Sequence, residues 1–251
     1  MPILAEITGK GKTDNIIKLI DRYLKTTEEK KQWNNKVIKE YLYIVTDYLP
    51  FTIADLNISH YAKESPNTTA YLIAKSQCIE SIRQVMRGVF LGLKDLHSLG
   101  ITHRDIKLSN ILISNNRYPI TKVKICDLGS SKKLVSDPND ESTQSLNYIG
   151  TRAFRAPELI VGNRYYDTKI DIWSSGIILL KLILVGYLGK KSTLFNVMNS
   201  KALAKAISDL VGEPTRVELQ EMLATNDLMS TNIKSGLSDE EIMRKRYKRL
   251  D

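Results

Sequence analysis

The stretch that decides the fold runs from His103 to Asn110 and reads His-Arg-Asp-Ile-Lys-Leu-Ser-Asn. It supplies a carboxylate at Asp105, a cation two residues later at Lys107 and a carboxamide at its end. Seventeen positions after Asn110 comes Asp127, a second carboxylate, followed by a leucine and a glycine that lets the backbone turn sharply. No other part of the chain concentrates so many chemically useful side chains.

These side chains are the set needed to move a phosphoryl group. One carboxylate orients the attacking hydroxyl and accepts its proton, and a lysine offsets charge on the moving group. A carboxamide and a carboxylate together hold Mg²⁺ through oxygen atoms, which this hard cation prefers. The sequence therefore predicts phosphoryl transfer.

Composition sets the outer limits. The 251 residues are enough for one large core or two modest ones, and the chain has two cysteines, so no disulfide framework is expected. The net charge of +9 comes from scattered lysines and arginines, which favours a solvated surface over a nucleic-acid patch. We expect no signal peptide and no apolar run long enough for a membrane helix. A cytoplasmic or nuclear location follows as an expectation.

Before the His103 stretch, the pattern predicts two strands and a helix. The strands are Ile16–Ile20 and Tyr41–Thr46, joined by a long exposed loop that includes the polar segment 26–39. Apolar residues spaced by three and four predict a helix over Ile79–Leu99, with Gly100 as its C-cap. That apolar stripe is expected to face the core.

After the His103 stretch, two short strands are predicted at Ile111–Ile113 and Val123–Cys126. The segment Ile170–Val185 is apolar nearly all round, as a central buried helix would be. Asp171 at its start is either a simple helix cap or a hydrogen-bond partner of the catalytic-loop backbone.

The motifs resemble those of the eukaryotic protein kinases. The catalytic loop has the form H-R-D-x-x-x-x-N, Asp127-Leu128-Gly129 stands where kinases have D-F-G, and Ala156-Pro157-Glu158 matches A-P-E. Within the kinases the chain is similar to the group of cyclin-dependent, MAP and glycogen synthase kinases, and most similar to glycogen synthase kinase 3. The latter similarity rests on three segments, 124–130, 148–158 and 212–216.

The resemblance implies an α+β, protein-kinase-like fold. Residues 1–49 would be the remnant of an incomplete β-rich N-lobe with its hinge, and residues 50–251 a mostly helical C-lobe, incomplete at its C-terminal end. The chemistry would be transfer of the ATP γ-phosphate to a serine or threonine hydroxyl of a protein, with ATP and Mg²⁺ as cofactors. The partners would be protein substrates and a docking or scaffold protein, with no nucleic acid and no membrane.

The same resemblance assigns the site. Asp105 would be the catalytic base and Lys107 would contact the γ-phosphate, while Asn110 and Asp127 would hold the metal and Thr151 would brace the base and the lysine. The adenine pocket would be formed by a residue at its back, two hinge residues, a floor residue and a thiol beside the metal site: Thr46, Asp47, Leu49, Leu112 and Cys126.

Regulatory residues are implied as well. Tyr148 occupies the activation-loop tyrosine position, and Arg152 and Arg155 would bind it once phosphorylated. An ordinary loop aromatic is the alternative for Tyr148. Arg104 and Lys132 match two of the three basic residues by which glycogen synthase kinase 3 binds a substrate that is already phosphorylated.

The N-terminal segment departs from the family pattern. Residues 1–15 leave no room for a glycine-rich loop or for the strand that carries the ATP-binding lysine. Glu6 is either a remnant of the helix glutamate that pairs with that lysine or a solvated surface charge. The chain also stops before the arginine that usually pairs with the residue at Glu158. Two functions therefore stay open, an active Ser/Thr kinase and a catalytically inactive kinase-like module that binds partners.

Overall fold

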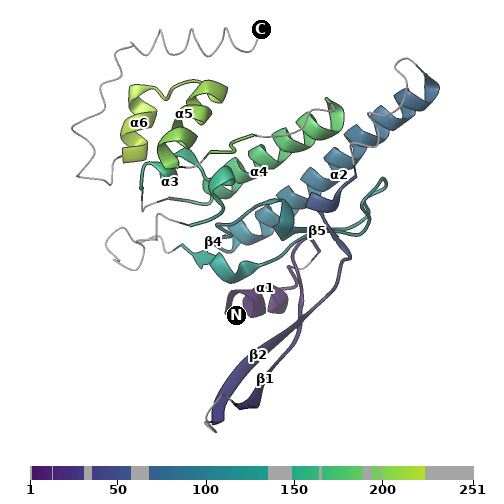
Figure 1. Ribbon diagram of the computed structural model, residues 1–251, viewed down its shortest axis with the longest axis vertical. Coiled ribbons are helices and arrows are strands. Elements are labelled where there is room, and N and C mark those ends of the chain that lie inside the picture. The colour runs from purple at the N-terminus through teal and green to yellow at the C-terminus, as the bar shows by residue number, and fades with distance from the viewer. Residues whose placement is uncertain are drawn as a thin grey trace.

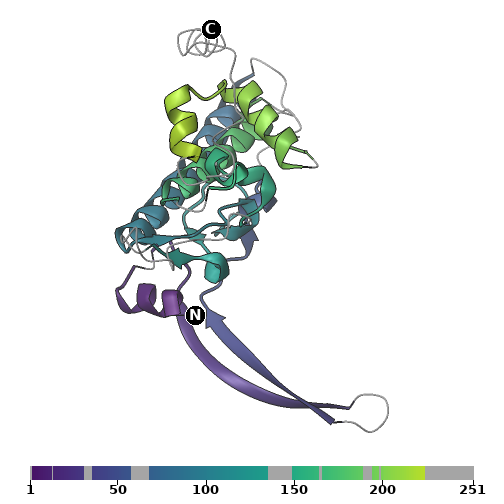
Figure 2. The ribbon, with the colours of Figure 1, turned by 90° about the vertical axis from the view of Figure 1, so that its left-hand side faces the viewer.

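A computed structural model describes residues 2–12, 14–30, 36–57, 68–134, 149–163, 166–188, 194–197 and 199–223, and the statements below concern these residues. The helices are α1 (Pro2–Gly9), α2 (Thr69–Ser98), α3 (Pro157–Ile160), α4 (Lys169–Leu182), α5 (Ser200–Val211) and α6 (Arg216–Leu223). The strands are β1 (Leu19–Lys30), β2 (Lys36–Thr46), β3 (Phe51–Thr52), β4 (Ile101–Thr102), β5 (Ile111–Ile113), β6 (Val123–Ile125) and β7 (Lys132–Lys133). Most helices gather in one body, and the β1–β2 hairpin projects away from it (Figures 1 and 2).

Helix α2 is the axis of the body. Its predicted apolar stripe is buried, with Val85, Val89 and Leu96 fully enclosed in the main core. The helix begins at Thr69 rather than at the predicted Ile79, because the Thr68 side chain accepts a hydrogen bond from Tyr71 N and caps an earlier start. It ends as predicted, with Gly100 just beyond it at a φ of +69°.

Helix α2 lies unusually close to strand β6. A Cβ atom added at Gly88 would come within 2.4 Å of the Val123 side chain, and one at Gly92 within 2.6 Å of Asn15 O. Both distances are shorter than side-chain contacts allow, so glycine is required for this approach. The approach holds β6, the strand that leads to Asp127, directly against helix α2.

Small antiparallel sheets hold the catalytic segments. The order β3-β5-β6 forms one sheet, and β4 pairs with β7 in another. Strands β5 and β6 match the predicted positions, with Ile111 opposite Ile125. Because the chain runs from β4 to β5 through residues 103–110, this loop has both of its ends anchored in sheets.

The first two predicted strands need correction. Ile16 and Ile17 are not part of the hairpin; Ile16 instead forms a parallel bridge with Ile125, and Ile17 N donates to Ile125 O at 2.8 Å. The segment 26–39, predicted as a loop, is largely strand, because β1 and β2 pair continuously from Asp21 opposite Val45 to Lys30 opposite Lys36. Backbone hydrogen bonds sustain this ladder without an apolar alternation in the sequence.

Helix α4 is the predicted central helix, and it continues as a π-helix over Ile183–Tyr187. An 18-residue window within these 19 residues reaches a mean hydropathy of 1.7, so the expectation that no segment is long and apolar enough to cross a membrane is wrong on length and composition. The helix is tied into the protein body, however. Ser174 Oγ donates to Phe154 O at 2.8 Å, and Ile178 and Leu182 are buried in the main core.

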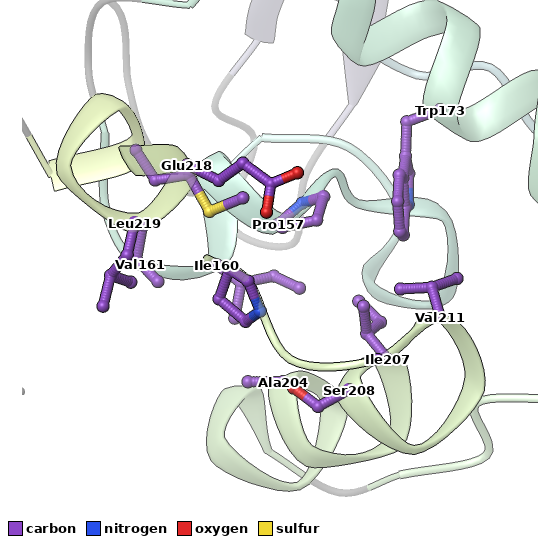
Figure 3. A pocket seen from close by; sticks show the side chains of 13 residues that line it. Pro157, Ile160, Val161, Trp173, Ala204, Ile207, Ser208, Val211, Glu218 and Leu219 are labelled. Atoms are coloured by element: carbon purple, nitrogen blue, oxygen red, sulfur yellow. The ribbon is translucent and has the colours of Figure 1, made fainter. Parts of the chain in front are cut away.

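Helices α3, α5 and α6 pack at the far end of the body. They enclose an apolar cavity of about 280 Å³ together with Trp173 of α4. Figure 3 shows Ile160, Ile207 and Val211 around this cavity, with Glu218 at one side. Pro157 also lines this cavity and follows Thr151 by six residues, so the cavity adjoins the end of the segment that carries Thr151.

Candidate active site

The backbone of the catalytic loop is hydrogen-bonded to Asp171 of helix α4. Both carboxylate oxygens of Asp171 accept backbone hydrogen bonds, from His103 N at 2.8 Å and from Arg104 N at 2.9 Å. Asp171 is 1% exposed, and its Oδ2 also lies 2.9 Å from His97 Nε2. Of the two alternatives for Asp171, a partner of the catalytic loop is therefore confirmed.

The turn after His103 is strained. Arg104 has a φ of +70°, a left-handed conformation that is uncommon for a residue with a Cβ atom. The Arg104 side chain donates from Nε to Ser130 O and from Nη1 to Tyr166 Oη, the second at 3.2 Å. His103 is buried, and its Nε2 lies 2.9 Å from Cys126 O. These contacts lock the turn in the conformation that presents the next residue, Asp105.

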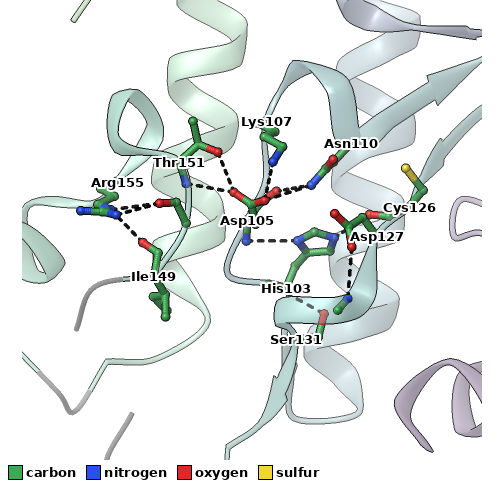
Figure 4. A network of polar contacts seen from close by, with 12 residues as sticks. His103, Asp105, Lys107, Asn110, Cys126, Asp127, Ser131, Ile149, Thr151 and Arg155 are labelled. Atoms are coloured by element: carbon green, nitrogen blue, oxygen red, sulfur yellow. Dashed lines mark hydrogen bonds and ion pairs between the residues drawn. The ribbon is translucent and has the colours of Figure 1, made fainter. Parts of the chain in front are cut away.

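Asp105 is the centre of a hydrogen-bond network (Figure 4). Its Oδ1 accepts from Thr151 N and from Thr151 Oγ1, each at 2.9 Å. Its Oδ2 accepts from Lys107 Nζ at 2.6 Å and from Asn110 Nδ2 at 3.3 Å. Asn110 Nδ2 also donates to Asp105 O at 2.9 Å. Four of the five predicted catalytic residues therefore meet on one carboxylate.

The network keeps Asp105 ionised. Burial of the carboxylate by itself raises its pKa, but the hydrogen bonds from Lys107 and Thr151 outweigh burial and hold the pKa of Asp105 below its usual value. The ionised form is the one that can take a proton from a hydroxyl, once one of its present donors gives way.

Gly150 brings Thr151 to the carboxylate. Its φ is +70°, and a Cβ atom at this position would lie 2.7 Å from Arg104 O. The backbone of the activation segment can therefore pass over the catalytic loop only at a glycine. Sequence reasoning did not single out Gly150, although the Gly-Thr pair in segment 148–158 was the available signal.

A backbone hydrogen bond holds the segment that carries Asp127 next to Asn110. Cys126 N donates to Asn110 O at 2.9 Å, which joins the residue before Asp127 to the other predicted metal ligand. Asp127 has a φ of +60°, is exposed, and accepts a hydrogen bond from Gly129 N at 3.3 Å. Figure 4 shows Asp105, Asn110 and Asp127 within one site. The two predicted acidic residues are thus brought together.

This arrangement fits a magnesium ion. The side-chain Nδ2 of Asn110 donates to Asp105, which leaves the side-chain Oδ1 of Asn110 available as a ligand. The Asp127 side chain is exposed to solvent. The described residues contain no cluster of three His, Cys, Asp or Glu side chains that could hold a metal. Mg²⁺ bound to a nucleotide suits such a site, because it takes one or two protein ligands and completes its shell with phosphates and water.

A cavity of about 460 Å³ adjoins Asp127. All five residues predicted to bind adenine line it: Thr46, Asp47, Leu49, Leu112 and Cys126. Leu4, Ile17 and Ile44 also line it, and sequence reasoning missed these three because they reach the cavity from α1, the Ile16 bridge and the hairpin. Most of the lining is apolar, and Asp127, a predicted metal ligand, also borders the cavity, which fits a nucleotide.

The comparisons with known proteins agree with this geometry. A family model described as "Protein kinase domain" matches residues 3–248. The chain belongs to the protein kinase family. Its fold is the protein kinase fold, a mixture of helices and small sheets.

Two curated relatives are Ser/Thr kinases by name. The kinase is 31% identical over 208 residues to the probable serine/threonine-protein kinase glkA of Dictyostelium discoideum, covering 83% of this chain and 36% of that protein. It is 35% identical over 174 residues to the probable serine/threonine-protein kinase MRK1 homolog of Encephalitozoon cuniculi, covering 68% of this chain and 48% of that protein. The chain therefore spans less than half of the length of either relative.

One solved structure shows the fold. A chain in the crystal structure of the yeast RNA Pol II CTD kinase CTDK-1 complex superposes with a TM-score of 0.57 at 24% identity. The match covers 86% of this kinase and 59% of that chain. Similarity at this level concerns the arrangement of the backbone.

The hinge of the kinase is fixed by its own ion pair. Lys124 Nζ lies 2.7 Å from Asp47 Oδ2, and Lys18 N donates to Asp47 Oδ1 at 2.7 Å. The Asp47 carboxylate is therefore occupied by the protein. Leu49 is buried and Leu112 half-buried, so this side of the cavity presents backbone and apolar surface.

The structure describes two of the three residues of the predicted phosphotyrosine site, Arg152 and Arg155. Tyr148 lies outside the described residues. Arg155 is 8% exposed and donates to Ile149 O at 2.8 Å and to Gly150 O at 2.9 Å, so it supports the turn before Thr151. Arg152 is half-buried at the start of the same short helical turn. Binding of phosphorylated Tyr148 by these arginines stays a prediction.

Arg104 and Lys132 lie on adjacent segments of the backbone. Lys132 lies opposite Thr102 in the β4–β7 pair, and Arg104 follows Thr102 by two residues. The Arg104 side chain is engaged by Ser130 O and Tyr166 Oη. Binding of a phosphorylated substrate by these two cations stays a prediction.

Glu6 behaves as a surface charge. Its Oε1 lies 2.9 Å from Lys10 Nζ and 3.0 Å from Lys133 Nζ. Hydrogen bonds from Lys10 and then Lys133 lower the pKa of Glu6. Neither lysine lines the nucleotide cavity, so the structure favours the surface alternative over an ATP-anchoring pair.

Glu158 is half-buried. It forms no ion pair within the described part of the chain, and burial raises its pKa, helped by the nearby charge of Asp167. The carboxylate that kinases usually neutralise with an arginine therefore has no described cation against it.

Proposed function

We propose that this chain is the catalytic part of a protein Ser/Thr kinase that transfers the ATP γ-phosphate to a protein hydroxyl. The observation that supports it is the convergence of Lys107, Asn110 and Thr151 on the Asp105 carboxylate, beside a cavity bordered by Asp127. Phosphoryl transfer depends mainly on positioning and on fixed charges, and these residues provide both.

Each residue has a role in this proposal. Asp105 accepts a hydrogen bond from the substrate hydroxyl and takes its proton, and Thr151 holds that carboxylate in place. Lys107 lies 2.6 Å from Asp105 Oδ2 and places positive charge where the transferred group passes. Asn110 and Asp127 would hold Mg²⁺, which neutralises phosphate charge when it is bound. Thr46, Asp47, Leu49, Leu112 and Cys126 would bind adenine.

The finer assignments extend the same proposal. Residues 1–49 would act as the small lobe and hinge and residues 50–251 as the large lobe. Segments 124–130, 148–158 and 212–216 support a relationship to glycogen synthase kinase 3. Arg104 and Lys132 would then favour substrates that already carry a phosphate, and Tyr148 would be phosphorylated beside Arg152 and Arg155. Protein substrates and a docking or scaffold protein would be the partners, in the cytoplasm or nucleus.

One observation favours the second candidate, an inactive partner-binding module. Among the described residues, no lysine or arginine lines the nucleotide cavity, so the α- and β-phosphates have no cationic anchor there. Loss of such an anchor costs orders of magnitude when catalysis depends on positioning.

A transfer assay separates the two functions. The full chain is compared with Asp127→Asn and Asp105→Asn, using ³²P-labelled Mg-ATP and a protein substrate mixture. The kinase proposal expects incorporation that falls by about 100-fold or more in both variants, since each loses a charge that acts in the transition state. Equal background rates in all three proteins favour the inactive module. A titration with a fluorescent ATP analogue then shows whether the cavity binds nucleotide without transfer.

A further inference from the structure

Lys124 is a largely buried cation that the proposed chemistry does not use. It lies in strand β6 opposite Leu112 of β5, so the two side chains belong to the same face of the sheet. Leu112 lines the nucleotide cavity, whereas Lys124 does not. The Lys124 side chain is 12% exposed, and a cation enclosed to this degree is costly unless it is paired. Its partners therefore indicate what it does.

The Lys124 ammonium group joins two other segments of the chain. Its Nζ lies 2.7 Å from Asp47 Oδ2 and donates to Ile16 O at 3.2 Å. Asp47 is also tied to the residues that follow Ile16, because Lys18 N donates to Asp47 Oδ1 at 2.7 Å and Asp47 N donates to Lys18 O at 3.2 Å. The contacts of these four residues close into a ring.

The segment that carries Ile17 is bound along β6 as well. Ile125 N donates to Asn15 O at 2.9 Å, and Ile17 N donates to Ile125 O at 2.8 Å. Three segments of the chain therefore meet around Lys124: this one, the hinge and strand β6.

Each of these three segments contributes to the wall of the nucleotide cavity. Ile17, Asp47 and Cys126, which directly follows β6, all line it. Lys124 is not a lining residue, so it acts on the cavity through the neighbours that it holds. Asp127, the proposed metal ligand, comes next after Cys126. The same lysine thus links the hinge side of the cavity to the strand that leads to the metal side.

We propose that Lys124 is a positioning residue for the nucleotide, which fixes the hinge at Asp47 against strand β6 and so sets the shape of the adenine end of the cavity. This inference rests on the proposed kinase function, since it takes the cavity to be the ATP site. The ring does not include the Asp105 network, so Lys124 acts on nucleotide binding rather than on transfer. In a site that works by positioning, a displacement of about 1 Å can cost about 100-fold.

Nucleotide binding measures this role without a transfer step. In the full chain, Lys124→Met keeps an apolar side chain of similar length and releases the Asp47 carboxylate. The Kd of a fluorescent ATP analogue in the presence of Mg²⁺ should rise about tenfold. The Kd of the matching GTP analogue should rise less, because a displaced hinge loses its selectivity for adenine. Lys124→Arg retains a cation and should keep most of the affinity.

The matched control is Lys122→Met. Lys122 is an exposed lysine two residues earlier in the chain, and it should have no effect on the Kd of either nucleotide. Thermal unfolding shows whether each variant is folded. The ratio of the two nucleotide affinities then separates loss of positioning from loss of folded protein, since unfolded protein lowers the amount of both complexes equally.

A double-mutant cycle tests whether Lys124 acts through Asp47. Asp47→Asn removes the charge that Lys124 pairs with, so Lys124→Met should change the Kd by less than about threefold in an Asp47→Asn background. A tenfold effect that persists in that background would overturn the proposed route. Equal Kd values for the wild type, Lys124→Met and Lys122→Met would overturn the positioning role itself.

Phosphoryl transfer keeps this test apart from that of the kinase function. A chain that binds the ATP analogue, loses affinity in Lys124→Met and transfers no phosphate supports the role of Lys124 and contradicts the kinase activity. A chain that transfers phosphate with the same KM for ATP in the wild type and Lys124→Met does the reverse. A wild-type chain that binds neither nucleotide overturns both proposals.

Discussion

Asp105 and Thr151 are joined by two hydrogen bonds to a single oxygen, since the backbone N and the Oγ1 of Thr151 both donate to Asp105 Oδ1 at 2.9 Å. The residues are 46 positions apart in the chain, so this contact closes the activation segment over the catalytic loop. The position of the segment is therefore coupled directly to the orientation of the carboxylate.

Thr151→Val removes one of these two bonds and keeps the size of the side chain. A hydrogen bond to a charged group contributes about 1.5–3 kcal/mol, so kcat should fall by about 10-fold or more. The KM for ATP should stay near that of the wild type, because Thr151 does not line the nucleotide cavity. Steady-state kinetics measure both constants. Thr151→Ser keeps the hydroxyl and should retain most activity; an equal loss in both variants would contradict the assignment.

Gly150→Ala tests the close approach of the two segments. The new Cβ would meet Arg104 O at 2.7 Å in a left-handed backbone conformation, which alone costs about 1–2 kcal/mol. Urea unfolding should show a loss of at least that size, together with lower activity. Gly176→Ala, in helix α4 with open space around its Cβ, should instead be neutral or stabilising by up to about 1 kcal/mol. A similar loss in both proteins would rule out the specific contact.

Asp171→Asn tests the hydrogen bonds that hold the catalytic loop to helix α4. The buried carboxylate accepts from both His103 N and Arg104 N, and an amide keeps only one acceptor oxygen. Unfolding free energy should fall by about 3 kcal/mol, since a buried donor is left without its partner. Asp95→Asn is the surface control. It loses an ion pair with Lys12 and should change stability by no more than about 1 kcal/mol.

Glu158 gives a pH-dependent prediction. Burial raises its pKa in the folded protein above the value near 4.3 of an unfolded chain. Below that value the carboxyl is protonated in both states, and as pH rises through the folded pKa the unfolded state is favoured by ionisation. Glu158→Gln should therefore increase Tm at pH 7 and have a smaller effect at pH 4.

The control for this titration is Glu80, a carboxylate whose pKa is shifted in the opposite direction. Hydrogen bonds from Arg83 lower the pKa of Glu80, so Glu80→Gln should remove stability at pH 7 and lose its effect as the solution is acidified. Thermal unfolding of the two variants across pH 4–7 measures both trends. Parallel curves for the two variants would show that Glu158 is not penalised by burial.

Local motifs identified residues that the structure brings together around Asp105. The spacing within 103–110 and the Asp127 motif identify residues that the structure brings together, and the stripe in 79–99 identifies the buried face of α2. The short strands β5 and β6 were also found, because their apolar runs are bounded by clear turns. In each case the signal lies within a few residues of the feature that it predicts.

Features that depend on distant partners were not predicted. Segment 26–39, the part of the hairpin farthest from the body, was taken for a loop because its sequence has no apolar alternation. The first turns of α2 were missed because Leu72 and Ile73 are exposed and no core stripe reaches them. Leu4 and Ile17 enter the nucleotide cavity only through tertiary packing.

The Asp105 carboxylate has a consequence for the enzyme at rest. Two carboxylate oxygens offer about four lone-pair positions, and four donor groups already occupy them: Thr151 N, Thr151 Oγ1, Lys107 Nζ and Asn110 Nδ2. An incoming hydroxyl must displace one of these donors, and the 3.3 Å bond from Asn110 is the longest. In this conformation the proposed base is therefore capped by its own neighbours, and a ligand that draws Asn110 or Lys107 aside would uncover it.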